Sequence, residues 1–165
     1  MPQQPKRLDA LDLKILIALQ REGRITNQRL SELVGLSPRP CLERVRRLET
    51  SGYIAGYRAI LSLAALPDLT VVFAEITLRN QATQALASFE KRLLDCSEVV
   101  ECYLVTGRFD YLAQIVCQSR ERYNQLTTEW IDDPDLPVAR IVSNFILKPV
   151  RQFQGYALDL SMAGP

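Results

Sequence analysis

Histidine is absent from this sequence of 165 residues, and cysteine occurs only four times. Without histidine the chain lacks the usual general base for a serine or cysteine nucleophile. The cysteines Cys41, Cys96, Cys102 and Cys117 form no C-x-x-C pair, the arrangement from which most structural zinc sites are built. A hydrolase and a zinc protein are therefore both disfavoured, and no cofactor is expected. We expect the four thiols to be buried as small apolar side chains.

Long apolar runs are also missing. No stretch approaches the roughly 18 apolar residues that span a bilayer, and the opening MPQQPKRLDALD lacks the apolar core of a signal peptide. We therefore expect a cytoplasmic protein with no membrane partner. Apolar residues nevertheless make up 47% of the chain, which is enough for real hydrophobic cores and disfavours a disordered chain.

Positive charge is concentrated in the first third of the sequence. Residues 1–60 contain eleven lysine and arginine side chains against six acidic ones, whereas the whole chain has a net charge of only +1. The remainder must therefore be acidic overall. A basic segment joined to an acidic one suggests two functions on one chain, the first of them contact with a polyanion.

Helix-start signals recur three times in this basic segment. Asp9 suits an N-cap with Asp12 three residues later, Thr26 suits a second N-cap, and Ser37 followed by Pro38 suits a third. Apolar residues follow each cap at helical spacing. Only the tripeptide GLS separates the second and third helices, which is the short glycine turn of a helix-turn-helix.

Arginines gather in the third of these predicted helices. At about 3.6 residues per turn, its apolar residues fall on one side and its arginines on a single exposed face, with Arg44 at the edge. Glu43 is the only acid among them, so DNA contact is favoured over a merely solvated surface. Recognition helices read base edges with their N-terminal residues, which favours base contact by Arg39 and phosphate contact farther along. The predicted DNA-binding residues are Ser37, Arg39, Pro40, Glu43, Arg44, Arg46, Arg47 and Arg58.

A weaker pattern follows the third helix. Residues 53–61 are typical of a wing or a short connecting strand, and Pro67 with Asp68 interrupts the pattern. We therefore predict a winged helix-turn-helix DNA-binding domain over residues 1–60 and a linker over residues 61–69.

From Thr70 onward, short strand patterns alternate with helical ones. Helices are predicted over 82–95 and 119–131, and strands over 70–79, 98–107, 109–118 and 139–150. The order βαββαβ is that of a ferredoxin-like sandwich, with two helices on one face of an antiparallel sheet. The other sheet face needs a cover, which predicts a dimer packed through the sheets. The fold class is α+β, with this domain over residues 70–152 and a tail over 153–165 that resembles a short extra strand.

The segment LVTGRFDYL lies between the second and third predicted strands. A tight hairpin alone accounts for Gly107. Alternatively, the turn borders a small pocket in which Asp110 binds an amino group and Arg108 a carboxylate, with Thr106 beside them. The sequence leaves both interpretations open.

The whole arrangement resembles the Lrp/AsnC family of bacterial and archaeal transcription regulators. The resemblance runs from Leu8 to about Arg151 and rests on LDALDLKIL, LQREGRITNQRLSELVGLSPRPCLERVRRLETSGYI and VVECYLVTGRFDYL, in the family's order and spacing. It implies a winged helix-turn-helix joined to a ligand-sensing domain. It also implies dimers that often assemble into octameric rings that wrap DNA, with amino-acid effectors bound between dimers.

The resemblance further implies which positions respond to an effector. Arg108 stands where the family commonly has an acidic or amide residue, and Arg120 and Asn144 are more polar than in leucine-responsive members. A polar or acidic effector, or none, is therefore favoured over leucine. The predicted effector-binding residues are Leu104, Thr106, Gly107, Arg108, Asp110, Arg120, Asn144 and Phe145.

Three functions are consistent with these patterns. The leading one is a sequence-specific transcription regulator whose DNA binding or assembly responds to an amino acid or a related small metabolite. The second is an effector-independent architectural protein that wraps or compacts DNA. The third, an enzyme built on the ferredoxin-like half, is least favoured because histidine is absent. The expected partners are double-stranded DNA, a small-molecule effector, and further copies of the chain in a homodimer that assembles to a tetramer or octamer.

Overall fold

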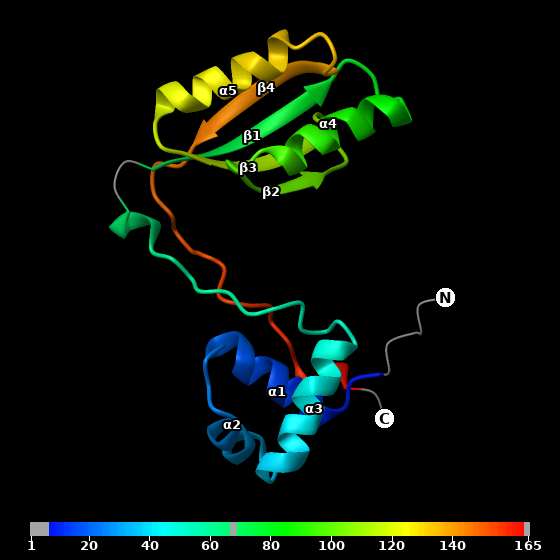
Figure 1. Ribbon diagram of the computed structural model, residues 1–165, viewed down its shortest axis with the longest axis vertical. Helices are drawn as coiled ribbons and strands as arrows, with labels where there is room; N and C mark the ends of the chain where they lie inside the picture. Colours follow the sequence, from blue (N-terminus) through cyan, green and yellow to red (C-terminus); the bar gives the residue numbers. More distant parts are fainter. Residues whose placement is uncertain (1–6, 67–68, 164–165) are drawn as a thin grey trace. The chain divides into compact units, whose positions relative to one another are not determined.

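The computed structural model describes residues 7–66 and 69–163, and these form two compact units (Figure 1). One unit comprises Met1–Leu61 together with Arg151–Pro165, and the other comprises Ser62–Val150. The chain therefore leaves the first unit once and returns to it. The sequence break predicted at Pro67 and Asp68 lies outside the described residues, as do residues 1–6 of the predicted DNA-binding domain and residues 164–165 of the predicted tail.

The first unit is built on three helices: α1 (Ala10–Arg21), α2 (Asn27–Val34) and α3 (Pro38–Thr50). Asp9 caps α1 as predicted, because its carboxylate accepts from the Asp12 N–H at 2.8 Å while the Asp12 carboxylate accepts from the Asp9 N–H at 3.2 Å. Thr26 caps α2, and Gly35 ends that helix in the left-handed conformation (φ 76°), which glycine adopts without strain. The predicted helix-turn-helix is therefore present.

Ser37 occupies the N-cap position of α3, but its side chain makes no capping hydrogen bond. An N-cap side chain accepts from the N–H of the second or third helical residue, and the third residue here is Pro40, which has no N–H. Pro38 at the first helical position supplies a fixed φ instead. The Asn27 side chain then holds this helix start by donating to the Pro38 carbonyl at 2.8 Å.

All three helices contribute side chains to one core. The buried apolar residues of this cluster are Ile15, Leu30, Val34, Cys41 and Leu48. Residues 53–61, predicted as a wing or a short connecting strand, form no strand, and neither does the tail, which was predicted to resemble a short extra strand. A strand needs a neighbour to take up its backbone hydrogen bonds, and neither of these segments pairs with a strand of the sheet.

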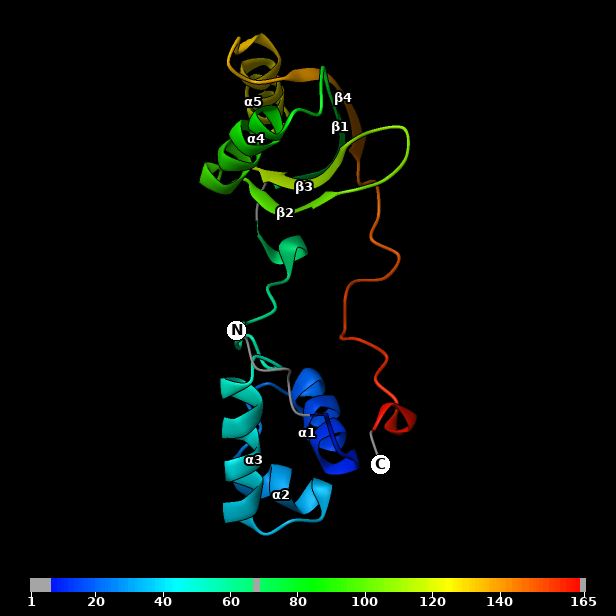
Figure 2. The ribbon, with the colours of Figure 1, turned by 90° about the vertical axis from the view of Figure 1, so that its right-hand side faces the viewer.

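The tail instead docks on α1 through hydrogen bonds between its backbone and a side chain of that helix. The Gln20 side chain accepts from the Tyr156 N–H at 2.6 Å and donates to the Tyr156 carbonyl at 3.3 Å. Gly155 has a φ of 110°, and a Cβ there would lie 2.9 Å from Gln20 Oε1, so both conformation and space favour glycine. The tail ends in the short 3₁₀ helix η2 (Leu160–Met162), which packs against α1 (Figure 2).

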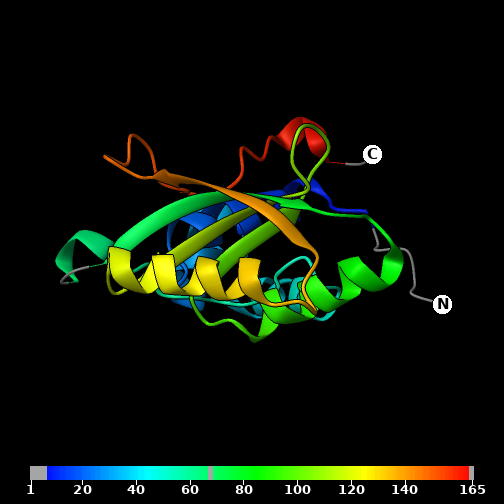
Figure 3. The same cartoon turned by 90° about the horizontal axis from the view of Figure 1, so that it is seen from above.

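The second unit is an antiparallel sheet with two helices on one face (Figures 1 and 3). A short 3₁₀ helix, η1 (Leu63–Ala65), precedes it. Its helices are α4 (Thr83–Asp95) and α5 (Arg120–Asp132), and its strands are β1 (Thr70–Leu78), β2 (Val99–Leu104), β3 (Tyr111–Cys117) and β4 (Val138–Phe145). The strand order is β2-β3-β1-β4, so the predicted α+β fold with a βαββαβ domain is confirmed.

Alternation along β1 separates the two sheet faces. Val72, Ala74 and Ile76 are fully buried in the core, which also contains Phe89 of α4 and Trp130 of α5 with their ring centroids 6.0 Å apart. The residues between them, such as Phe73 and Glu75, face the opposite side of the sheet, because successive side chains of a strand point to opposite faces. This second face is called the open face below.

The four cysteines are free thiols, and Cys41 and Cys117 are buried in the two cores. Cys96 and Cys102 are half-buried and pack against the second core. Burial raises the pKa of all four, that of Cys102 to about 11, so they remain protonated and weakly nucleophilic at neutral pH. Within the described parts of the chain, no helix combines the length and apolar character needed to cross a membrane.

Candidate functional site

The exposed surface of α3 begins at its N-terminus. Ser37, Arg39 and Pro40 are exposed there, and Glu43 and Arg46 continue the exposed face along the helix. The Arg39 side chain is 91% exposed, and its Nε lies 3.4 Å from Glu43 Oε1. An exposed pair of this kind contributes little stability and separates readily. The start of α3 therefore presents an arginine that is free to contact another molecule.

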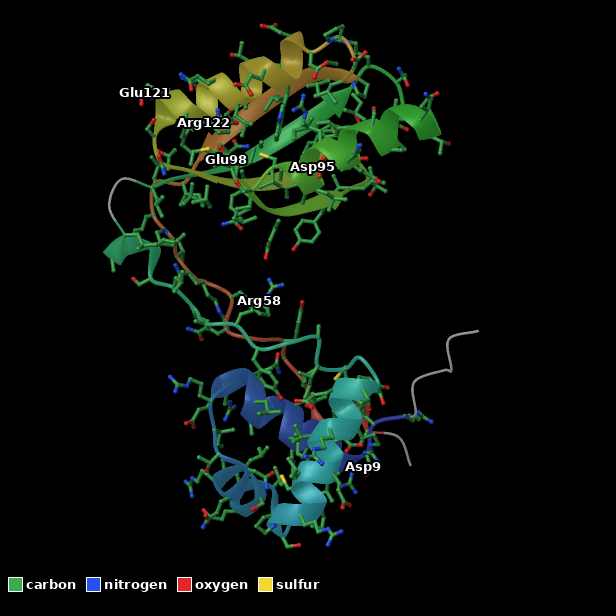
Figure 4. All side chains as sticks on the ribbon, viewed as in Figure 1. Asp9, Arg58, Asp95, Glu98, Glu121 and Arg122 are labelled. Atoms are coloured by element: carbon green, nitrogen blue, oxygen red, sulfur yellow. The ribbon has the colours of Figure 1, made fainter. Side chains whose placement is uncertain are left out.

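Arg44 lies at the edge of this face, as predicted, whereas the prediction that Arg47 lies on the exposed face is wrong, because Arg47 is half-buried and paired with an acid. Arg44 Nη1 donates to Asp9 at 2.6 Å and to Asp12 at 2.8 Å, while Arg47 Nη2 donates to both carboxylate oxygens of Asp12 at 2.5 and 2.7 Å. Helical spacing alone places a residue on a face but says nothing of the acids on a neighbouring helix. Asp9 lies at the start of α1, beside α3 (Figure 4).

Hydrogen bonds favour the charged forms of Asp9 and Arg44. Burial acts to raise the pKa of Asp9, but hydrogen bonds from the Arg44 side chain and the Asp12 backbone outweigh it and lower that pKa. The hydrogen bond to Asp9 in turn raises the pKa of Arg44. Asp12 is 2% exposed, and a buried carboxylate normally requires such partners. Two of the arginines of α3 are therefore neutralised by two acids of the α1 capping box.

Arg58 is exposed on the extended segment that follows α3 (Figure 4). It borders an apolar groove of about 520 Å³ within the first unit, formed by α1, residues 53–60 and the docked tail. The structure does not group Arg58 with the arginines of α3.

A polar pocket of about 290 Å³ lies on the open face of the second unit. The loop between β2 and β3, which projects from the sheet in Figure 2, contributes Arg108 and Phe109, and the sheet contributes the remaining residues. Arg108 Nη2 lies 3.8 Å from Glu75 Oε2, and Asn144 Nδ2 donates to Glu75 Oε1 at 3.2 Å. The pocket is lined by Glu75, Thr77, Arg108, Phe109, Arg140, Val142 and Asn144. It thus offers one carboxylate and two guanidinium groups to a small ligand.

Two of the predicted effector residues, Arg108 and Asn144, meet in this pocket. Asp110 does not, which corrects its predicted role as the acceptor of an amino group. It is 8% exposed, and its carboxylate accepts from the Leu78 N–H at 2.7 Å and from the Gln81 amide at 2.6 Å. Asp110 therefore anchors the end of the loop to the end of β1.

The structure places Arg120 and Phe145 elsewhere. The Arg120 guanidinium lies 4.9 Å from the centroid of the Phe145 ring, and that ring packs edge-on against Tyr123 of α5 at 5.5 Å. Tyr123 is part of the core beneath the helices, so this pair lies on the helix-covered face and not on the open face. Leu104, Thr106 and Gly107 are exposed along the loop and its approach.

Sequence reasoning missed five of the lining residues: Glu75 and Thr77 of β1, Phe109 of the loop, and Arg140 and Val142 of β4. The polar residues at alternate positions of β1 were a signal, because they mark a face that is not core. The register that pairs Thr77 with Arg140 is a tertiary property. Among the described residues, no group of three or more His, Cys, Asp and Glu side chains is placed to bind a metal ion.

Comparisons with known proteins agree with this architecture. Residues 8–55 match the family described as winged helix-turn-helix DNA-binding, and residues 71–155 match the Lrp/AsnC ligand binding domain. The leucine-responsive regulatory protein of Escherichia coli (strain K12) is 46% identical over 124 residues, which cover 75% of this chain and 76% of that protein. The protein of the same name from Klebsiella pneumoniae is also 46% identical, over the same shares of the two chains.

Solved structures show the same fold. A transcriptional regulator of Neisseria meningitidis, solved in complex with L-Met, is 33% identical with a TM-score of 0.78, covering 88% of this chain and 93% of that one. An AsnC family regulator from Agrobacterium tumefaciens is 27% identical with a TM-score of 0.82, covering 93% and 98%. Because the ligand-binding family matches more than half of the chain and the first unit carries the helix-turn-helix, this chain belongs to the Lrp/AsnC family of transcriptional regulators.

Proposed function

We propose that the protein is a sequence-specific DNA-binding regulator whose DNA binding is controlled by an amino acid or a related small metabolite. The observation that carries this proposal is the exposed N-terminus of α3, where Arg39 stands beside Ser37 and Pro40 in a helix-turn-helix. A guanidinium at that place can donate two hydrogen bonds to the N7 and O6 of guanine. The DNA-binding function is assigned to residues 1–60.

Phosphate contacts are assigned to the rest of the exposed surface. Arg46 is exposed about two turns beyond Arg39 on α3, and Arg58 is exposed farther along the chain. Phosphate contacts fix the position of a protein on DNA without reading sequence. Arg44 and Arg47 are left out of this proposed set because Asp9 and Asp12 neutralise them.

The effector is assigned to the polar pocket within residues 70–152. Glu75 suits an α-amino group, and Arg108 with Arg140 suits the α-carboxylate and a polar or acidic side chain. A volume of about 290 Å³ suits a ligand of this size. The Neisseria meningitidis regulator solved with L-Met supports an amino acid as the class of ligand, while the charges here favour a more polar one.

The first experiment is a mobility-shift titration on DNA from upstream of the protein's own gene. Random competitor DNA is present throughout, and the titration is repeated across a panel of amino acids. The proposal predicts a shift that survives the competitor and that one or a few amino acids alter. Complexes that competitor removes and no amino acid changes would instead support an architectural DNA-compacting protein.

A matched pair of variants assigns the effector response to the pocket. Arg140→Ala removes a guanidinium from the pocket lining, whereas Lys91→Ala removes a positive charge from the exposed surface of α4, on the other side of the sheet. The proposal predicts that only Arg140→Ala abolishes the amino-acid effect while basal DNA binding persists. Equal responses in both variants would place the effector elsewhere.

We propose that the part of the open sheet face formed by Phe73 and Tyr103, beside the effector pocket, is a dimer interface. Phe73 is 37% exposed and Tyr103 is 56% exposed, and the strand register puts both on this face. Burying them against a second copy would remove apolar surface from water and set two α3 helices on two half-sites of DNA. Phe73→Lys is expected to give monomers in analytical ultracentrifugation, and an unchanged dimer would exclude this face.

A further inference from the structure

The capping box of α1 makes hydrogen bonds to α3 as well as within α1. Asp9 and Asp12 accept from each other's N–H groups, which is all that a capping box requires. They also accept four hydrogen bonds from Arg44 and Arg47, which lie 32 to 35 residues away in sequence. The start of α1 is thereby tied to the middle of α3.

These ion pairs reduce the positive charge on α3 that is available to contact DNA. Asp12 is 3% exposed in its side chain and binds both guanidinium groups, and Asp9 binds Arg44 a second time. The cluster therefore holds two positive and two negative charges. The exposed arginines of α3 that remain are Arg39 and Arg46.

The two paired arginines are nevertheless close to solvent. The Arg44 side chain is 25% exposed and the Arg47 side chain is 40% exposed. Arg47 directly follows the exposed Arg46 and lies one turn beyond the exposed Glu43 on the same helix. A guanidinium released from its acid would thus enter the solvent layer beside the proposed DNA surface.

We propose that Asp9 and Asp12 are specificity-determining positioning residues that withhold Arg44 and Arg47 from DNA phosphates. This inference rests on the proposed DNA-binding function. Phosphate contacts raise the affinity for every sequence alike, whereas base contacts by Arg39 favour one. Withholding two phosphate contacts lowers binding to random DNA, and it leaves the reading of bases by the N-terminus of α3 unchanged.

Asp9→Asn is the most informative variant, because asparagine caps helices as well as aspartate does. It removes the negative charge that faces Arg44 without removing the cap or the buried carboxylate of Asp12. The measurement is the slope of log K against log salt concentration for full-length protein on random-sequence DNA, with thermal unfolding recorded in parallel. Each released arginine that reaches a phosphate steepens this slope by about 0.9.

The expected result for Asp9→Asn is a slope steeper by up to about 0.9, together with tighter binding to random DNA and a smaller ratio of specific to random affinity. Asp12→Asn removes the acid shared by both arginines, so it should steepen the slope further. Combining Asp9→Asn with Arg44→Gln should return the slope to that of the unaltered protein. A merely structural tie would weaken binding to all DNA and could not produce these gains.

Glu22→Gln is the matched control, since it makes the same change in net charge at the exposed end of α1. It should leave the slope nearly unchanged. Slopes that are equal in the unaltered protein and Asp9→Asn, or an equal steepening in Glu22→Gln, would overturn the inference while leaving DNA binding intact. Absence of DNA binding by the unaltered protein would overturn both the inference and the proposed function.

Discussion

Arg39 and Arg46 are both exposed on α3 but stand at different distances from its N-terminus. Arg39→Ala is expected to remove a base contact, which costs about 1–3 kcal/mol on the preferred sequence and little on random DNA. Arg46→Ala is expected to weaken binding to all sequences evenly and to reduce the salt slope by about 1. Fluorescence anisotropy on both kinds of DNA across a salt series measures each quantity.

The contrast between these two variants is what tests the assignment. Equal losses on preferred and random DNA for Arg39→Ala would remove it from the base-reading set. An altered sequence preference for Arg46→Ala would instead move the reading surface farther along α3.

Glu98 gives the second unit a pH-dependent contribution to stability. Its carboxylate accepts from Arg122 Nε at 2.7 Å (Figure 4), and this hydrogen bond lowers the Glu98 pKa from 4.5. Because the folded-state pKa is the lower one, the contribution is complete above about pH 4.5 and is lost as pH falls through the folded-state value.

The prediction for Glu98→Gln follows from the lowered pKa of Glu98. The variant should unfold at lower urea concentration than the unaltered protein at pH 7, and the difference should shrink below pH 4.5. Trp130, the chain's single tryptophan, is buried in the second unit, so its fluorescence reports unfolding of that unit alone. A difference that stays constant from pH 7 to pH 3 would contradict the role given to the carboxylate.

The docked tail is held on α1 by two hydrogen bonds between Gln20 and Tyr156. Gly155→Ala would place a Cβ 2.9 Å from Gln20 Oε1 at a backbone φ of 110°, so the paired hydrogen bonds between Gln20 and Tyr156 should be lost. We expect faster hydrogen exchange across residues 151–159, while α2 and α3 remain protected.

Two further variants serve as a second test and a control for this experiment. Gln20→Ala removes the same hydrogen bonds from the side of α1 and should give the same faster exchange. Gln152→Ala alters an exposed residue of the tail and should leave exchange unchanged. Unaltered protection in both Gly155→Ala and Gln20→Ala would show that other contacts hold the tail.

The elements that could be predicted from sequence are those specified locally. Caps and helical periodicity defined α1, α2 and α3, and alternation defined the four strands of the sheet. The expected strands in residues 53–61 and in the tail were wrong because strand formation depends on a partner. Ser37 could be predicted as an N-cap, but Pro40 removes one of the two donors that its side chain would use.

Over the whole molecule, what sequence reasoning lacked was long-range pairing. Asp12 and Arg44 are 32 residues apart, and Gln20 and Tyr156 are 136 residues apart. No short sequence pattern predicts either of these hydrogen-bonded pairs. The pocket likewise depends on the register between β1 and β4. This register pairs Glu75 with Val142, and it sets Arg140 and Asn144 opposite Thr77 and Phe73 on either side. Two of the predicted effector residues, Arg108 and Asn144, lie together in that pocket, whereas Asp110 is buried outside it.

Coupling between the two units is the central claim, and it can be measured directly. If a ligand changes the affinity of the protein for DNA by some factor, DNA must change the affinity of the protein for that ligand by the same factor. The measurement is calorimetric titration of the amino acid identified by mobility shift into full-length protein, with and without its preferred DNA. The account predicts saturable binding that DNA alters by the factor seen in the shift, and no binding to Arg140→Ala. Binding that DNA leaves unchanged, or no saturable binding to the unaltered protein, would contradict it.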